Sequence, residues 1–207
     1  MKIKLYSTKL VKSKSMSLPA SWEEADNDSL FVQAIHVYRD RAHGSPAKVK
    51  TRSAVAGSTK KIHRQKGTGF ARHGDRKANI FVGGGAAHGP KGVKRKLSLP
   101  KKMRVRARRI AYFRKAAVGE LLALEGIGSI KKTKEAVKFL DKILSSEGLK
   151  KNSKITLVLS EQNEALRSFF RNIAGLGVLS AAQANAYKIF LGGKILVDRK
   201  VFEENKK

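Results

Sequence analysis

Residues 155–160 read Ile-Thr-Leu-Val-Leu-Ser, a short and almost continuous apolar run. Such a run is typical of a strand that is buried on both faces, as in a parallel sheet. Helical spacing of apolar residues follows from Asn163 through Phe170, then a glycine-interrupted strand at Ile173–Leu179 and another strand at Ile195–Val197. Short strands that alternate with helices predict an α/β fold, a three-layer-like globular domain with a mostly parallel sheet.

The pattern continues outside this region. Strands are expected at Ile3–Leu5 and Ile127–Ile130, and Ser13–Pro19 is either a turn or a strand. A helix capped by Asn27 or Asp28 is expected to end near Gly44, and Thr133 and Asp198 are expected to cap two others. A short helix is expected around Asn185–Leu191. Pro100 suits the first turn of a helix whose apolar face runs through Ile110, Leu121 and Leu124 to Gly126. The order of the strands in the sheet stays open.

One stretch has a different composition. Gly44–Arg109 holds 20 lysines and arginines, 10 of the 18 glycines and a single acid, Asp75. Its large apolar residues up to Lys96 are mostly isolated and follow no helical or strand period, so it cannot bury enough apolar surface to fold alone. We therefore expect residues 1–43 and 100–207 to form the globular domain, and residues 44–99 to form a long extended basic loop.

The charge predicts the class of partner. The chain has 45 lysines and arginines against 16 acids, a net charge of +29, which indicates a polyanion. Nucleic acid is favoured over an anionic membrane, because no amphipathic helix with an aromatic or leucine face accompanies the charge. Phe70 and Phe81 are the loop's only Phe, Tyr or Trp residues, so we expect it to read backbone and shape more than stacked bases. A 50-residue excursion folded back on itself reaches up to ~80 Å, which suits a crevice in a folded RNA.

Other classes of site have little support. Gly67-Thr-Gly69 lacks the preceding strand and the third glycine of a dinucleotide motif, and Pro90 stands where a phosphate-binding loop needs lysine. The five histidines have no metal-ligand spacing and there is no cysteine, so no cofactor, metal or catalytic residue is expected. The beginning of the chain shows no signal peptide, and no long apolar run occurs, so we expect a soluble, cytoplasmic protein.

The residues Lys60-Lys-Ile-His-Arg-Gln-Lys-Gly-Thr-Gly-Phe-Ala-Arg-His-Gly74, with Gly83-Gly-Gly85 and Gly89-Pro-Lys91, closely resemble the bacterial-type large-subunit ribosomal protein L-four family. Matches such as Leu99-Pro-Lys-Lys102 extend the resemblance over nearly the whole chain. The resemblance implies an α/β domain on the outside of the large ribosomal subunit. It also implies a loop threaded into the large-subunit ribosomal RNA, with its tip at the nascent-peptide exit tunnel.

By this resemblance, the tip nearest the tunnel comprises His63, Arg64, Gln65, Lys66 and Gly67. The predicted RNA-binding residues are Lys48, Lys50, Arg52, Lys60, Lys61, Arg64, Gln65, Lys66, Gly67, Thr68, Gly69, Arg72, Arg76, Lys77, Lys91, Lys94, Arg95, Lys101, Lys102 and Arg104. The chain departs from the family pattern at Ile62-His63, Phe70 and His73, among others. Family members commonly have Pro-Trp in place of Ile62-His63, and Arg and Gln in place of Phe70 and His73.

The predicted function is therefore that of a non-enzymatic constituent of the large subunit, which supports assembly and lines the exit tunnel. Its predicted partners are large-subunit ribosomal RNA, neighbouring large-subunit proteins and the nascent peptide, with no membrane and no small-molecule substrate. Two alternatives stay open. One is an RNA-modifying enzyme whose α/β body binds a nucleotide cofactor, and the other is a sequence-independent DNA-compacting protein.

Overall fold

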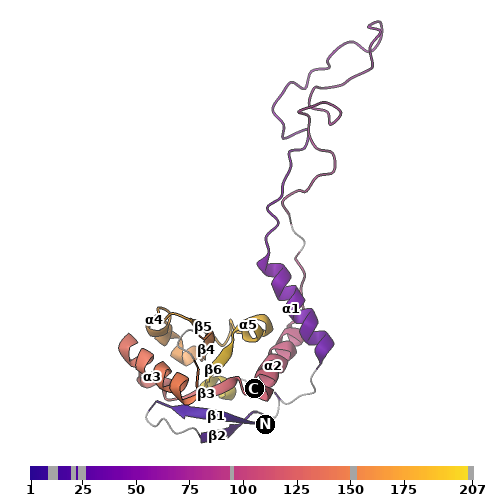
Figure 1. Ribbon diagram of the computed structural model, residues 1–207. Coiled ribbons are helices and arrows are strands. Elements are labelled where there is room, and N and C mark those ends of the chain that lie inside the picture. Colours follow the sequence, from indigo (N-terminus) through magenta and orange to yellow (C-terminus); the bar gives the residue numbers. More distant parts are fainter. Residues whose placement is uncertain (9–13, 20–21, 23–26, 94–95, 150–152, 205–207) are drawn as a thin grey trace. The chain divides into compact units, whose positions relative to one another are not determined.

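The computed structural model describes residues 1–8, 14–19, 22, 27–93, 96–149 and 153–204 (Figure 1). Contacts between Cα atoms divide the chain into two compact units. One unit, here called the α/β unit, comprises Met1–Asp40 and Ser98–Lys207. The other, here called the arm, comprises Arg41–Leu97. Among the described residues no helix is both long and apolar enough to span a membrane.

The α/β unit is built on a six-stranded sheet with the order β2-β1-β3-β6-β4-β5. The strands are β1 (Lys2–Ser7), β2 (Lys14–Ser17), β3 (Leu121–Glu125), β4 (Ile155–Leu159), β5 (Leu176–Ser180) and β6 (Lys194–Asp198). Only β2 is antiparallel to its neighbour, β1, and every other pairing is parallel. The predicted α/β class with a mostly parallel sheet is confirmed.

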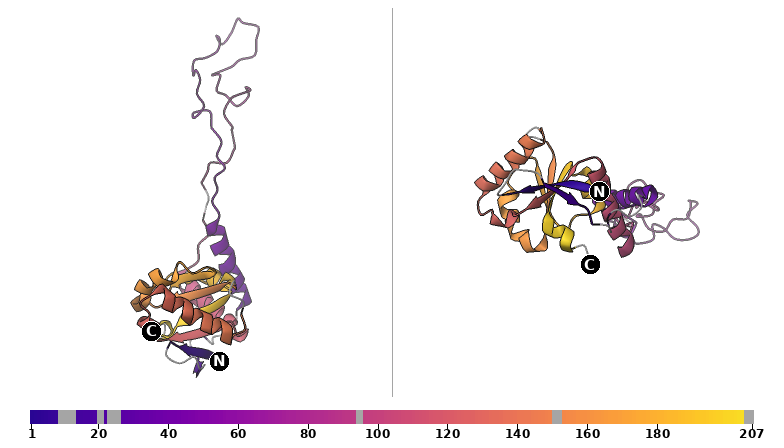
Figure 2. Two further views of the ribbon diagram at one scale, coloured as in Figure 1. Left: turned by 60° about the vertical axis from the view of Figure 1, so that its left-hand side comes forward. Right: turned by 90° about the horizontal axis from the view of Figure 1, so that it is seen from below.

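Helices cover both faces of this sheet (Figures 1 and 2). The described helices are α1 (Asp28–Ala42), α2 (Lys101–Ala117), α3 (Thr133–Ser146), α4 (Arg167–Phe170), α5 (Ala186–Leu191) and α6 (Arg199–Glu204), with 3-10 turns η2 (Ile127–Ser129) and η3 (Glu161–Leu166). One apolar cluster contains residues of α1, α2, α5 and α6, and a second contains residues of η2, α3 and α4. The result is three layers, helix on sheet on helix.

The central strands divide their side chains between the two clusters. In β3, Leu121 and Ala123 belong to the first cluster, whereas Leu122 and Leu124 belong to the second. This division follows from the two-residue period of a strand, and it requires an apolar residue at every position. The run of apolar residues in the sequence is therefore the direct signature of burial on both faces.

Several element predictions are confirmed and others are wrong. Asn27 caps α1, because its side-chain oxygen accepts a hydrogen bond from the Leu30 backbone N–H at 2.9 Å. Of the two predicted caps, Asn27 and Asp28, the first is therefore confirmed. The helix predicted from Pro100 to Gly126 is wrong in its second half, because α2 ends at Ala117 and Leu121–Glu125 is strand β3. Gly119, with φ of 74°, lies between the two elements in a conformation that favours glycine.

Two neighbouring predictions also need correction. The strand predicted at Ile127–Ile130 is the 3-10 turn η2, since β3 already occupies that place in the sheet. The helix predicted from Asn163 starts as the 3-10 turn η3 and becomes α-helical only at Arg167.

Glu147 joins three parts of the α/β unit. Its carboxylate lies just after α3 and accepts hydrogen bonds from Lys194 of β6 (2.6 Å) and from Lys4 (2.8 Å) and Tyr6 (2.6 Å) of β1. The side chain is only 6% exposed. Burial alone would raise the pKa of the Glu147 carboxyl, but the hydrogen bonds from Lys194, Lys4 and Tyr6 outweigh it and lower the pKa to about 2.

We predict that Glu147→Gln lowers the free energy of unfolding by about 2 kcal/mol at pH 7, because the amide cannot replace a carboxylate that is paired with two lysines. Because the pKa is lower in the folded state, this stabilisation is fully present above about pH 4.5 and is lost as the pH falls towards 2. Urea unfolding of the full chain at pH 7 and pH 2.5 measures both effects. Glu164→Gln is the control, since Glu164 is exposed, and equal stability of the two variants at pH 7 would contradict the role of Glu147.

Candidate nucleic-acid interface

The arm consists of two chain segments that run in opposite directions and are joined by backbone hydrogen bonds. Lys48 and Lys91 form an antiparallel bridge, and the Val49 N–H donates to the Pro90 carbonyl at 3.0 Å. Farther along, the Ala86 N–H donates to Lys50 O at 2.9 Å. After the end of α1 at Ala42, the described arm residues contain no helix or extended ladder, so these single contacts define the course of the arm.

Glycines let the two segments approach closely. A Cβ atom added to Gly85 would lie 2.2 Å from the Arg52 nitrogen, and one added to Gly89 would lie 2.0 Å from a Val49 methyl carbon. Neither gap can hold a side chain, since real Cβ contacts do not fall below 3 Å. These two glycines therefore allow the two sides of the arm to pack closely against each other.

The predicted tip residues lie on a tight turn. The Ile62 N–H donates to Gly74 O at 3.0 Å, which brings the two sides together, and the Arg64 guanidinium donates to Gly67 O at 3.0 Å. Gly67 has a φ of 80°, a conformation that other residues rarely adopt. The backbone of the turn is thus held by its own side chains, while Arg64 and Lys66 remain exposed.

Histidine and phenylalanine rings form a small cluster next to the tip. The rings of His63 and His73 have centroids 6.0 Å apart, and His73 lies 4.9 Å from Phe81. The His63 Nε2 is 2.9 Å from the Ala71 carbonyl oxygen. Two residues that depart from the family pattern, His63 and His73, therefore contact each other. The sequence offered no signal for this pairing, because ten residues separate the two histidines.

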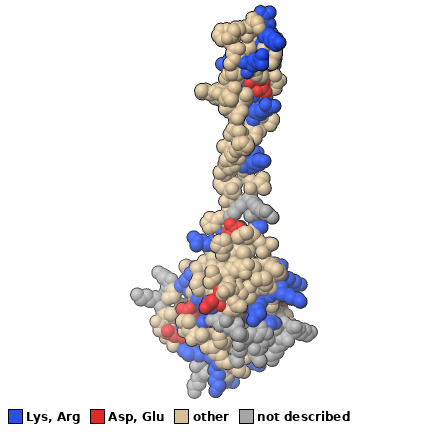
Figure 3. Space-filling view, turned by 90° about the vertical axis from the view of Figure 1, so that its right-hand side faces the viewer, with Lys and Arg blue, Asp and Glu red and all other residues tan. Residues whose placement is uncertain are grey.

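The basic side chains of the arm are exposed and have no acidic partners. None of the lysines and arginines described within 41–93 and 96–97 forms an ion pair with a carboxylate. Among the predicted RNA-binding residues of the arm that the structure describes, only Thr68 and Lys77 are half-buried. The exposed ones are Lys48, Lys50, Arg52, Lys60, Lys61, Arg64, Gln65, Lys66, Gly67, Gly69, Arg72, Arg76 and Lys91. Lys94 and Arg95 lie outside the described residues. Figure 3 shows lysine and arginine side chains distributed along the arm.

The structure brings three of these lysines together. Lys48, Lys50 and Lys91 line a hollow of about 570 Å³, together with Val49, Thr51 and Ala54. Three ammonium groups around one hollow repel each other, so the arrangement favours an anion that lies among them. The remaining predicted residues, Lys101, Lys102 and Arg104, belong to α2 in the α/β unit, and all three are exposed.

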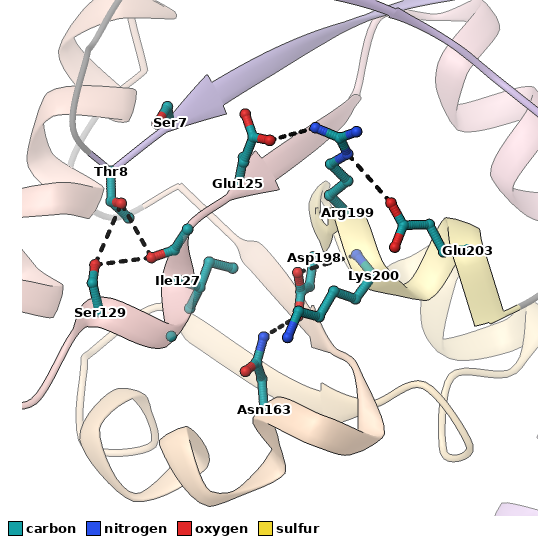
Figure 4. A pocket seen from close by; sticks show the side chains of 12 residues that line it. Ser7, Thr8, Glu125, Ile127, Ser129, Asn163, Asp198, Arg199, Lys200 and Glu203 are labelled. Carbon is teal, nitrogen blue, oxygen red and sulfur yellow. Dashed lines mark hydrogen bonds and ion pairs between the residues drawn. The ribbon is translucent and has the colours of Figure 1, made fainter.

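A different pocket lies at the carboxyl ends of the parallel strands β1, β3 and β6 (Figure 4). In α/β folds this edge is where ligands commonly bind. Here the buried Asp198 accepts hydrogen bonds from Ser160 and Asn163, both at 2.6 Å, and Arg199 pairs with Glu125 and Glu203. Because these charges neutralise one another, this edge is a poor site for a polyanion.

No group of three or more histidine, aspartate or glutamate side chains suitable for a metal ion occurs among the described residues. The candidate interface therefore consists of cationic and polar groups, and what it can do chemically is to neutralise phosphates.

The chain was compared with known proteins. Residues 16–207 match the model of the ribosomal protein L4/L1 family. The large ribosomal subunit protein uL4 of Aquifex pyrophilus is 40% identical over 156 residues, which cover 74% of this chain and 76% of that protein. The uL4 protein of Chloroherpeton thalassium is 34% identical over 89% of this chain and 86% of its own length. That of Campylobacter curvus is 30% identical over 98% and 96%, respectively.

We predict that Gly85→Ala weakens RNA binding by the full chain roughly tenfold, because the added Cβ forces the two sides of the arm apart and misplaces their cations. Gly74→Ala is the matched control. A Cβ added at Gly74 would have no atom within 4 Å, and Gly74 has no positive φ. The RNA affinity of the Gly74→Ala variant should therefore change by less than about twofold. Filter binding to large-subunit ribosomal RNA measures the affinities, and equal effects of the two substitutions would refute the role of the close approach.

Proposed function

The chain belongs to the ribosomal protein L4/L1 family, and from this membership we propose that it binds large-subunit ribosomal RNA through the arm, supports assembly of the large subunit and lines the nascent-peptide exit tunnel. Its relatives are named as proteins of the large ribosomal subunit, a structural rather than an enzymatic role. The compartment of the proposed function is the cytoplasm, where the ribosome works.

One observation carries the RNA-binding proposal. The arm presents a row of exposed lysines and arginines that have no carboxylate partner among the described residues, with Asp75 as the only acid in its sequence. Charges of one sign held at close spacing raise the energy of the free protein, and condensed phosphates lower it. A folded RNA supplies such phosphates on several sides of an inserted segment at once.

The tip is proposed to face the exit tunnel. Arg64 and Lys66 are exposed on a turn that its own hydrogen bonds hold in shape, and this supports their presentation on a surface that a passing peptide can reach. The proposed partners are accordingly the ribosomal RNA, neighbouring large-subunit proteins and the nascent peptide.

The enzyme alternative has lost its main support. A nucleotide site built on Gly67 and Gly69 requires a strand before the glycines and a helix after them. The described residues around these glycines form turns and bends of the arm, with neither element in place. No observation favours a second function over RNA binding.

We predict a steep salt dependence of binding to large-subunit ribosomal RNA. If about ten arm cations each meet a phosphate, the logarithm of the affinity should fall with the logarithm of salt concentration at a slope of roughly −7 to −9. Removing three of them in Lys48→Ala/Lys50→Ala/Lys91→Ala should flatten the slope by about 2 to 3. The control Lys134→Ala/Lys138→Ala/Lys142→Ala removes the same charge from exposed positions of α3. An identical slope for both triple variants would argue against the arm as the binding element.

We also predict that the segment Arg64–Lys66 crosslinks to large-subunit ribosomal RNA when intact cells are irradiated. Mass spectrometry of nucleotide-bearing peptides from purified large subunits reads this out. Exposed lysines of α3 serve as the comparison within the same sample. Complete absence of crosslinks from the tip, with crosslinks present elsewhere in the chain, would exclude the proposed insertion of the arm.

A further inference from the structure

A second cationic hollow is lined entirely by residues of the α/β unit. It has a volume of about 210 Å³ and is lined by residues of α1, α2 and the loop before α5: Tyr38, Lys101, Arg104, Val105, Arg108, Ala182, Ala184 and Asn185. None of these eight residues is acidic. The sequence predicted Lys101 and Arg104 as RNA contacts, but it gave no indication that they share a hollow with Tyr38.

Helical spacing places the cations on one side of this hollow. Lys101, Arg104 and Arg108 stand at positions i, i+3 and i+7 of α2, which lie on the same face of a helix. Lys101 and Arg104 are exposed, and their side chains have no hydrogen-bond or ion-pair partner among the described residues. Arg108 is half-buried, and its Nη1 donates to the Ala181 carbonyl at 3.3 Å, which anchors it. On this face of α2, Arg108 is therefore held by the protein, whereas the side chains of Lys101 and Arg104 can contact a ligand.

The other walls are apolar or neutral. Tyr38 is half-buried and packs against the first apolar cluster, so its ring is held in place. Ala184 is buried and Val105 is half-buried. The Asn185 Oδ1 accepts a hydrogen bond from the Lys188 N–H at 2.9 Å, and the amide nitrogen of the same side chain can still donate.

We propose that this hollow binds one nucleotide of an RNA strand, with a phosphate between Lys101 and Arg104 and the sugar or base against the Tyr38 ring. A cationic wall beside an aromatic ring is the combination by which proteins hold single-stranded or looped RNA. With a volume of about 210 Å³, the hollow has no room for more than one nucleotide unit. The inference rests on the proposed function, because the RNA in question is the large-subunit ribosomal RNA.

A partner with carboxylate side chains is the other class that the cations could attract. An acidic peptide would use Lys101 and Arg104, but it would gain little from the flat face of Tyr38. RNA uses both features, so the combined site favours RNA.

The first test compares two single arginine substitutions, each made in the full chain. Arg104→Ala should weaken binding to purified large-subunit ribosomal RNA about five- to tenfold at fixed salt. Arg106→Ala, which removes the same charge from an exposed position of α2 that does not line the hollow, should change it less than about twofold. Equal losses for the two variants would overturn the inference, since the loss would then reflect charge alone.

Tyr38 provides the second test. Tyr38→Leu should lower the affinity several-fold with an unchanged salt slope, because stacking is lost and no phosphate contact is removed, whereas Tyr38→Phe should bind like the unmodified chain. Thermal melting identifies any loss of folding in Tyr38→Leu. Normal RNA affinity of a folded Tyr38→Leu variant would contradict the proposed contact.

The outcomes separate this inference from the proposed function. If the unmodified chain binds ribosomal RNA and crosslinks through the arm, but Arg104→Ala equals Arg106→Ala, only the inference fails. If the unmodified chain shows no preference for ribosomal RNA over duplex DNA of equal length, the proposed function fails with it. If Arg104→Ala abolishes binding of a hexaglutamate peptide and leaves RNA binding intact, the hollow is a site for acidic protein segments and the inference is wrong.

Discussion

Uncompensated positive charge is the constraint on which the rest of the molecule depends. From Arg41 to Leu97 the sequence offers a single carboxylate, Asp75, so nearly all cations of the arm lack an acid within the same segment. The arm therefore achieves its course through backbone hydrogen bonds, glycine contacts and a small ring cluster, none of which consumes positive charge. Apart from Lys61 and Arg64, whose side chains also form hydrogen bonds within the tip turn, the groups that shape the arm are not the ones that attract anions.

In the α/β unit, in contrast to the arm, charged side chains take part in holding the fold together. Its acids are placed where they tie elements together, as Glu147 does between β1 and β6 and Asp198 does at the start of α6. A buried carboxylate is stable only when it is well paired, and in this unit lysines, hydroxyl groups and an amide supply the partners. Glu147 and Asp198 thus contribute to folding, whereas the cations of the arm have no such carboxylate partner among the described residues.

Much of this was predictable from the sequence, for reasons that particular residues make clear. Ile155–Leu159 is apolar at every position except Thr156 because both faces of β4 are buried, and this pattern predicted the fold class. Leu121–Glu125 was misassigned because Leu121 and Leu124 also fit a helical period, and only the sheet decides between the two. The composition located the basic residues, but contacts between distant positions, such as His63 with His73 or Tyr38 beside Arg104, leave no periodic trace in a sequence.

The position of β6 has a consequence for biosynthesis. This strand follows the other five described strands in the chain, yet it lies between β3 and β4 and pairs with both. Until Lys194–Asp198 is available, these two strands have no common neighbour, and each presents an unpaired apolar edge of the kind that promotes aggregation. The sheet can therefore close only after Lys194–Asp198 has been translated. Termination before Lys194 would leave β3 and β4 without the strand that lies between them.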